Sequence, residues 1–389
     1  MKEWKEYLLE ELADDITVGY VGPMSSEYVS SGIPFLRSLN VEPLKIIPQN
    51  LKFISHEFHK KIGKSKLLPG DVVIVRTGKP GACALIPEWL NEANCSDLVI
   101  VRCGDQIDNY FLTYYINSKA TEHIYTHTVG AVQQHFNVAS ARSISIPLPP
   151  LPEQKAIASV LGSLDDKIDL LTRQNRTLEA LAETLFRQWF IEEAKEDWEE
   201  GTLEQFCSIS RGASPRPIIK YVVDGTVPWI KIADATGSNT FFIDSTKEFI
   251  IEAGVLKSVR VSHGDLIMSN SATCGLPYFV EIEGCIHDGW LLFRELKHIS
   301  RLYLFFFLCS VYRELNSMAD GSVQNNLNTE MLKNYPVKKP PVALIQQFNE
   351  CAEQCVNRIK KNIYKIRTLE KTRDTLLPKL MSGEVRVGS

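Results

Sequence analysis

The chain repeats itself once, and this duplication constrains its fold more than any other feature of the sequence. The segment GAVQQHFN at 130–137 returns as GSVQNNLN at 321–328, an offset of 191 residues. Other matches hold an offset of 194 in the first part of each half and 191 in the second; they are Trp4 with Trp198, IPF at 33–35 with VPW at 227–229, Gly70-Asp71 with Gly264-Asp265, and RTLE at 176–179 with RTLE at 367–370. Chance alignments do not hold one offset over so many positions. The sequence therefore predicts a tandem duplication.

Length and composition limit the class of protein. The 389 residues exceed what one ordinary hydrophobic core holds together. With 44% hydrophobic residues, 23% charged residues and no apolar run of about 20, the composition is typical of a soluble globular protein and predicts no membrane association. The start, MKEWKEYLLEEL, lacks the apolar core of a signal peptide, and the nine cysteines form no CxxC pair. We therefore expect a cytoplasmic protein without a disulfide framework or a zinc ribbon.

Each half begins with a globular part, expected at 1–151 and 193–341. LLPGDVVIVRTGKPG indicates a strand followed by a turn, and SHGDLIMSNSATCG is its copy. The stretches at 108–127 and 301–318 have the apolar spacing of helices. The sequence predicts two α+β domains of about 150 residues each.

Each half ends in a long helix, expected at 152–192 and within 342–389. In the first copy we expect the helix from about Gln154, because the prolines of LPPLPEQ disfavour an earlier start. Its apolar positions step by four and three: Ile157, Leu161, Leu164, Ile168, Leu171, Asn175, Leu178, Ala182, Leu185 and Trp189. The second copy continues the same pattern through Ile345, Phe348, Ala352, Cys355, Ile359, Asn362, Ile366, Leu369, Arg373, Leu376 and Leu380. These are coiled-coil seams in which one Asn per helix fixes the register, and Arg373 departs from the pattern.

The charges of the two helices favour their pairing with each other. The stretch 153–196 has six Lys/Arg against nine Asp/Glu, whereas 342–389 has nine against five. An acidic and a basic helix in one chain suit an antiparallel coiled coil. The alternative is that both sets of charges only solvate exposed helix faces.

Three segments resemble a known family. LPPLPEQKAIASVLGSLDDKIDLLTRQNRTLEALAETLFRQWF at 148–190 resembles the central conserved helix of the specificity (S) subunit of type I restriction–modification systems, and TLLPKLMSGEVRV at 375–387 is similar to its C-terminal end. GAVQQHFN and GSVQNNLN are similar to the amide-rich element of its target-recognition domains. The second copy departs from the pattern, with PPVALIQQ in place of LPPLPEQK.

The resemblance implies a function for each part. Each globular domain would read one half of an asymmetric, bipartite double-stranded DNA target, and the paired helices would set the spacer between the halves. The implied partners are two methyltransferase (M) subunits and restriction/translocase (R) subunits, and no cofactor is implied for this chain. Outer apolar residues of the first helix, Val160, Leu170 and Leu181, are candidates for docking the methyltransferases.

Amides and basic residues near predicted turns are the candidates for DNA contact. Gln and Asn can bond bidentately to adenine and Arg to guanine. The first group lies in the repeated segment: Gln133, Gln134, Asn137, Gln324, Asn325 and Asn326. The second lies on the turn after a predicted strand in each copy: Arg76, Thr77, Lys79, Ser269, Asn270 and Ser271. The third, Arg37 and Lys231, follows the IPF and VPW strands. Alternatively, the amides cap and brace loops through backbone bonds.

The overall charge neither favours nor excludes DNA binding by itself. The formal net charge of −4 is unusual for a DNA-binding protein, but residues 52–79 hold seven Lys/Arg and two acidic residues. In the family of specificity subunits that this chain resembles, the methyltransferase partners also clamp the DNA.

The sequence gives little support for an enzymatic function. Gly63-Lys64-Ser65 resembles the end of a P-loop, but the motif requires glycine where Phe58 stands. No (Asn/Asp)-Pro-Pro-(Tyr/Phe) motif and no HExxH occurs. We predict a non-catalytic subunit without a metal site. Two alternatives remain open, a coiled-coil scaffold that reads no DNA and an enzyme with unrecognised methyltransferase or nuclease chemistry.

Overall fold

The computed structural model describes residues 4–119, 136–222, 225–236, 240–271, 274–320 and 326–387. It divides into two compact units. Unit 1 consists of Met1–Leu171 with Tyr364–Ser389, and unit 2 of Thr172–Ile363. The predicted division by function into 1–151, 152–192, 193–341 and 342–389 stays a prediction.

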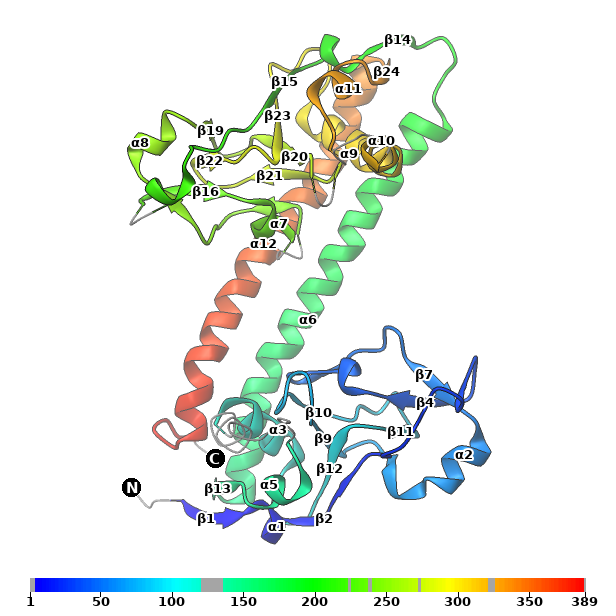
Figure 1. The fold of residues 1–389 in the computed structure, drawn as a ribbon, viewed down its shortest axis with the longest axis vertical. Coiled ribbons are helices and arrows are strands. Elements are labelled where there is room, and N and C mark those ends of the chain that lie inside the picture. The colour runs from blue at the N-terminus through cyan, green and yellow to red at the C-terminus, as the bar shows by residue number, and fades with distance from the viewer. Residues whose placement is uncertain are drawn as a thin grey trace. The chain divides into compact units, whose positions relative to one another are not determined.

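The described part of unit 1 is built on two sheets and two short two-stranded ribbons (Figure 1). The four-stranded antiparallel sheet runs in the order β10 (Cys83–Leu85), β9 (Val72–Val75), β12 (Leu98–Cys103) and β2 (Ala13–Val18). The five-stranded sheet runs β3 (Tyr28–Val29), β7 (Lys52–Ile54), β4 (Ile33–Leu36), β11 (Ala93–Cys95) and β8 (Lys66–Leu67). β1 (Lys5–Leu8) pairs with β13 (Ser145–Leu148), and β5 (Val41–Glu42) with β6 (Lys45–Ile46). All four residues of β9 are buried, as expected of a continuous apolar run in a central strand.

Three of the four short α-helices in the described part of unit 1 begin at a side chain that caps them, and α1 does not. They are α1 (Leu9–Leu12), α2 (His56–Lys61), α3 (Asn109–Ser118) and α5 (Val138–Arg142). Ser55 caps α2, and Asp108 caps α3 by accepting a hydrogen bond of 2.9 Å from the backbone N–H of Phe111. α3 packs on the four-stranded sheet and buries Phe111, Leu112 and Ile116 there.

Unit 2 repeats this architecture. Its first sheet runs β15 (Ser208–Arg211), β23 (Trp290–Arg294), β20 (Leu266–Ser269), β21 (Pro277–Val280) and β17 (Phe242–Ile243). Its second runs β18 (Phe249–Ile250), β16 (Val227–Ile230), β22 (Gly284–Ile286) and β19 (Val259–Val261), while β14 (Glu199–Thr202) pairs with β24 (Pro336–Lys339). Its helices are α7 (Ile232–Thr236), α8 (Glu252–Val255), α9 (Arg301–Ser310), α10 (Tyr312–Asp320) and α11 (Thr329–Lys333).

The strand orders confirm the duplication. β10-β9-β12-β2 corresponds to β21-β20-β23-β15, and β7-β4-β11-β8 corresponds to β18-β16-β22-β19. The IPF strand β4 is parallel to β11, and the VPW strand β16 is parallel to β22. Parallel neighbours carry their carboxyl ends to the same edge of a sheet, so the loops after these two strands meet in both units.

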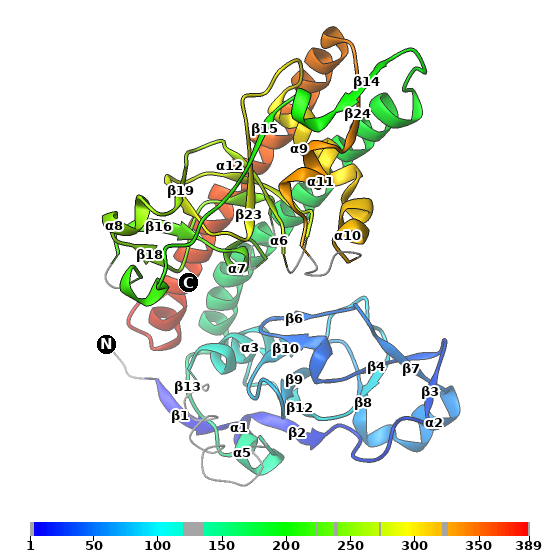
Figure 2. The same cartoon turned by 45° about the horizontal axis from the view of Figure 1, so that its top comes forward.

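The two long helices are α6 (Leu151–Arg187) and α12 (Val342–Met381), and a segment of each belongs to each unit. In both units these segments lie side by side and run in opposite directions (Figures 1 and 2). The predicted start at Gln154 is wrong by three residues, because Pro152 lies in the first turn, where a helix needs no N–H donor. α6 ends in a π-helical turn, Gln188–Glu192.

The predicted seam positions are buried or half-buried and include the predicted polar positions. In unit 2 the side-chain amide of Asn362 donates to Oδ1 of Asn175 at 2.8 Å and to Oε1 of Gln174 at 3.0 Å, with both Asn residues buried. In unit 1 Arg373 pairs with Asp165 at 2.7 Å, and this carboxylate also accepts a 2.5 Å hydrogen bond from Tyr114. Arg373, which breaks the apolar pattern of the seam, therefore has an acidic partner on the facing helix.

Candidate functional site

In unit 1, a polar cluster forms where three strands end. The side chain of Asp97, just after β11, accepts hydrogen bonds from Ser38, after β4, at 3.0 Å and from Thr77, after β9. The guanidinium of Arg76 lies 3.9 Å from the same carboxylate. We call Ser38, Arg76, Thr77 and Asp97 the Asp97 cluster. It joins two of the predicted turns, and its centre is a residue that the sequence analysis did not select.

Unit 2 has a cluster in the corresponding place. Asp288, just after β22, accepts a 2.5 Å hydrogen bond from Ser214 and lies 3.3 Å from a terminal nitrogen of Arg216. Its backbone carbonyl accepts from Nε of Arg211 at 2.7 Å and from the side-chain amide of Asn270 at 3.2 Å. We call these five residues, Arg211, Ser214, Arg216, Asn270 and Asp288, the Asp288 cluster.

The electrostatics of the Asp288 cluster favour an ionised carboxylate. Burial by itself would raise the pKa of Asp288, but the hydrogen bonds from Ser214 and from its own backbone N–H, with the charge of Arg216, outweigh it. The net effect is a pKa below the ordinary value. Asp288 is therefore an anion that holds cationic and hydroxyl donors around it at neutral pH.

The repeated amide-rich segment ends against the same clusters. The backbone N–H of Phe136 donates to the carbonyl of Arg76 at 3.2 Å, and that of Leu327 donates to the carbonyl of Asn270 at 3.1 Å. Phe136 and Leu327 are buried. In both units the amide-rich segment therefore meets the turn after the strand. The backbone hydrogen bond that joins them is the same in both units, although the side chains differ.

The last residue of each repeated segment caps a helix. Asn137 accepts a 2.9 Å hydrogen bond from the N–H of Ser140 at the start of α5, and Asn328 accepts one of 2.8 Å from Met331 at the start of α11. This geometry supports the capping alternative for Asn137. Asn326 is half-buried, and Gln133, Gln134, Gln324 and Asn325 lie outside the described residues.

The remaining candidates differ in exposure. Lys79 is exposed and Ser271 is half-buried. Ser269 and Asn270 have no exposed side-chain surface. The hydroxyl of Ser269 donates to the carbonyl of Leu276 across the turn that follows β20, and the amide of Asn270 donates to the carbonyl of Asp288, so their observed role is to hold backbone segments. The candidates Arg37 and Lys231 are half-buried; Arg37 donates to the carbonyl of Asn50 at 2.7 Å, and Lys231 pairs with Glu248.

The sequence analysis missed six residues of these clusters, Ser38, Asp97, Arg211, Ser214, Arg216 and Asp288. Asp97 and Asp288 stand at an offset of 191, the same offset as the amide-rich segments. Each is the second residue after the strand that pairs in parallel with the IPF or VPW strand. The duplication therefore contained a signal for both acids, whereas Arg211 and Arg216 have no charged counterpart in unit 1.

The three candidates for partner docking also differ. Leu170 and Leu181 are 50% and 48% exposed on α6. Val160 packs against the core of unit 1, beside residues of the same cluster such as Ile157 and Leu161. The expectation that Val160 lacks an intramolecular neighbour is therefore wrong, because α6 also buries this side of its first turns in unit 1.

Neither a metal site nor a membrane span is found in the described part of the chain. Within the described ranges, no three His, Cys, Asp or Glu side chains are grouped to hold a metal ion. No helix there is long and apolar enough to cross a membrane.

Comparisons with known proteins identify the family. The model of the type I restriction modification DNA specificity domain matches residues 1–180 and 195–364. The putative type I restriction enzyme MjaX specificity subunit of Methanocaldococcus jannaschii is 22% identical over 99% of this chain and 94% of its own length. The HindI specificity subunit of Haemophilus influenzae is 21% identical over 99% of this chain and all of its own.

A solved structure has the same fold. The type I restriction–modification S subunit from M. genitalium superposes with a TM-score of 0.65 at 15% identity, over 97% of this chain and 96% of that one. Together with the family match to both halves, this confirms the resemblance drawn from the three sequence segments. The chain belongs to the family of type I restriction–modification DNA specificity proteins, and it is a DNA-recognition subunit with two specificity domains that works with other subunits.

Proposed function

We propose that each unit reads one half of a bipartite duplex DNA target through the strand ends gathered at its acidic cluster. The observation that supports this proposal is that the two units share a backbone arrangement but carry different side chains on it. The carbonyl of residue 76 or 270 accepts the same bond from the amide-rich segment in both units, yet one position is Arg and the other Asn. Two domains with the same backbone arrangement and different side chains at the same place are suited to an asymmetric DNA target.

Charge supports DNA contact by unit 1 near its second sheet. Lys52, Lys60, Lys61 and Lys64 are exposed on β7, on α2 and in the turn after it, and Lys79 is exposed on the turn after β9. Cations of this kind contribute non-specific affinity by releasing counterions from phosphates. Because the net charge of the chain is −4, the partner subunits supply part of the clamp in this proposal.

The long helices serve as the spacer and the assembly surface in this proposal. A helix of 37 residues such as α6 is about 55 Å long at 1.5 Å per residue. Two methyltransferase subunits dock on the helical region, and restriction subunits join through them. The exposed Leu170 and Leu181 support docking, since apolar side chains on a helix surface favour burial against a partner. A cavity of about 640 Å³ between α3, α6 and α12 in unit 1 offers a second contact region.

A domain exchange tests the reading function. Residues 1–151 are replaced by the corresponding residues of a relative with a different target, and the methylated motif is determined by sequencing in cells that also express the methyltransferase. We expect one half-site to change and the other half-site to stay. A change in both halves, or in neither, would contradict one reader per unit.

A charge substitution tests the docking surface. Leu170→Lys together with Leu181→Lys should weaken assembly with the methyltransferase by at least tenfold, because an unpaired charge at an apolar contact costs several kcal/mol. Ile219→Lys, at an apolar residue that is 79% exposed away from the long helices, is the matched control. Native mass spectrometry of the co-expressed proteins measures the two-to-one complex. Wild-type assembly of the double variant would mean that docking uses another surface.

A further inference from the structure

Two arginines of unit 2 converge on one aspartate just after the end of a strand, one at its backbone carbonyl and one at its carboxylate. Arg211 ends β15 and donates to the backbone carbonyl of Asp288, and Arg216 approaches the carboxylate five residues later. Ser214, between them, donates to the other carboxylate oxygen at 2.5 Å. The segment 211–216 is thus attached at three points to Asp288.

Stability does not account for this arrangement. The side chain of Arg216 is 76% exposed and that of Asp288 is 42% exposed. An ion pair with this much exposure contributes little to folding. The exposed guanidinium is nevertheless held in place by its neighbours, which is how a recognition group is presented at low entropic cost.

The loop also lies beside the elements that the proposed function assigns to reading. Asn270 donates to the carbonyl of Asp288, and its own carbonyl accepts from Leu327 at the end of the amide-rich segment. The charge of Lys231 acts on His287, which neighbours Asp288. Arg216 therefore belongs to the same edge of unit 2 as the other candidates.

Unit 1 has the same loop without the cations. Gly212 donates to the carbonyl of Trp290 at 2.9 Å, and Gly19 makes the matching bond to Leu98 at 2.8 Å. From these glycines the two loops read GASPRP at 212–217 and GYVGP at 19–23. The backbone anchor is common to both units, whereas the arginines occur in unit 2 alone.

We propose that Arg216 reads a guanine in the half-site bound by unit 2, with Asp288 as its positioning residue. This inference rests on the proposed function of unit 2 as a DNA reader. A guanidinium matches the O6 and N7 acceptors of guanine bidentately, and a carboxylate can accept from the amino group of the paired cytosine. A phosphate is the weaker candidate for the ligand, because the half-exposed carboxylate of Asp288 repels it.

The test compares Arg216→Ala with Arg260→Ala in the complete complex. Arg260 is a matched control, since it is 67% exposed and pairs with Glu252 at 3.4 Å in the same unit, apart from the cluster. Both variants are expressed with the methyltransferase partners, and methylated sites are mapped by genome-wide sequencing. A lost bidentate contact of about 1–3 kcal/mol corresponds to about 5- to 150-fold lower methylation at the original site.

The expected pattern is specific to one position. Arg216→Ala should lower methylation of the original motif at least fivefold and relax one guanine of the second half-site, with the first half-site unchanged and Arg260→Ala like the wild type. A motif identical to that of the wild type, at equal or uniformly lower methylation, would overturn the inference. If the wild-type complex methylates no bipartite motif, it is the proposed function that fails, before any variant is compared.

Discussion

The two units share their strand register but fill their cores with side chains of different size. In unit 1 Val101 stands opposite Val72, and in unit 2 Phe293 stands opposite Leu266 in the same register. Leu85 of β10, which stands opposite Val72, likewise corresponds to Phe279 of β21, which stands opposite Leu266. Cores tolerate such exchanges when the total volume is refilled. The backbone frame therefore depends on the pattern of buried positions and leaves the identity of the side chains free.

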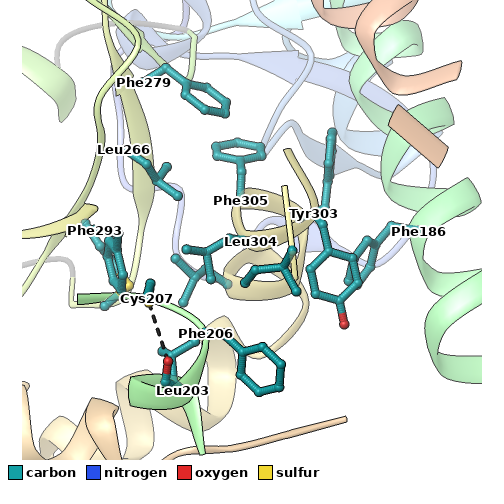
Figure 3. Packing of buried hydrophobic residues seen from close by; sticks show 14 of the residues in the cluster. Phe186, Leu203, Phe206, Cys207, Leu266, Phe279, Phe293, Tyr303, Leu304 and Phe305 are labelled. Carbon is teal, nitrogen blue, oxygen red and sulfur yellow. Dashed lines mark hydrogen bonds between the residues drawn. The ribbon is translucent and has the colours of Figure 1, made fainter. Parts of the chain in front are cut away.

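The extra volume in unit 2 is taken up by aromatic packing. Figure 3 shows Phe186 of α6 beside Tyr303 of α9, with Phe305, Phe279 and Phe293 in the same cluster. The ring centroids of Phe186 and Tyr303 are 5.4 Å apart, and those of Phe279 and Phe305 are 4.8 Å apart. The same freedom applies at the strand ends, where a common backbone carries Arg76 in one unit and Asn270 in the other. A duplicated chain can thus retain one fold and acquire two specificities.

The largest expected effect is a cavity in the aromatic core. Phe186→Ala should destabilise unit 2 by about 3–5 kcal/mol, because Phe186 is 2% exposed and contacts four aromatic rings. Leu377→Ala, at the matching position of α12, should cost unit 1 only about 1–2 kcal/mol, because Leu377 is half-buried. Hydrogen exchange of β20 and β9, measured by mass spectrometry, follows the two units separately. Equal losses would mean that the aromatic and aliphatic cores are energetically equivalent.

The polar positions of the helix seam should show the next largest difference. Arg373→Leu leaves Asp165, whose side chain is 18% exposed, without its ion-pair partner, and should cost unit 1 about 2–3 kcal/mol. Asn362→Leu leaves only neutral amides, those of Asn175 and Gln174, without this partner and should cost unit 2 about 1–2 kcal/mol. Chemical denaturation followed by unit-specific hydrogen exchange measures both.

A double substitution provides the control for the ion pair. Asp165→Leu combined with Arg373→Leu should recover most of the stability lost in Arg373→Leu, because no uncompensated charge remains. If the double variant is as unstable as the single one, packing of the Arg373 stem and not its charge is what the seam requires.

A pH-dependent difference is expected in unit 2 at Glu179 of α6. Burial, with the nearby charge of Glu183 and against that of Arg176, raises the pKa of Glu179 to about 7. Cys309 of α9 packs near these acids. Because the folded state binds the proton more tightly than the unfolded state, there is no penalty below pH about 4.5, and the penalty grows until about pH 7.

Replacement of that carboxylate isolates its contribution. Glu179→Gln should stabilise unit 2 by about 1–2 kcal/mol at pH 8, after allowance for solvent screening, and by nothing measurable at pH 4. Glu370→Gln, the matching residue of α12, controls for the loss of a helix charge. Thermal unfolding from pH 4 to pH 8 measures the difference. A gain that is the same at both pH values would contradict a titrating Glu179.

The smallest effect should be equal in the two units. Asn137→Ala and Asn328→Ala should each cost about 1 kcal/mol, because each removes one helix cap of the same geometry. Asn137→Ser and Asn328→Ser retain a capping oxygen and should be close to the wild type in both stability and methylated motif. A changed motif in the Ser variant at unchanged stability would instead identify that Asn as a base-reading residue.

Local patterns in the sequence predicted most of the architecture. The heptad spacing predicted α6 and α12 and the buried Asn pair, because helix periodicity is a property of a continuous segment. Prolines near the start of α6 misled the prediction of its first residue, since proline at the first helical turn costs no hydrogen bond. Val160 was assigned to the outside because the seam pattern describes two helices and omits the sheet domain packed on a third side.

The candidate site was predictable only in part. Similar segments at one offset located the amide-rich ends and the strand turns, and both lie at the clusters. Sequence alone left open whether Asn137 caps a helix or reads a base, since the same amide can do either, and the observed bond to Ser140 assigns it a cap.

The sequence by itself determined the duplication, the two helices with their seam, and the family. Each of these can be recognised from a continuous segment or from a constant offset between similar segments. Only the tertiary structure decided which polar residues meet. Ser38, Thr77 and Asp97 are joined because β4, β9 and β11 end at one place, and Arg216 reaches Asp288 across 72 residues for the same kind of reason. Contacts of this type depend on strand order and on parallel pairing, which long-range packing selects and no local pattern encodes.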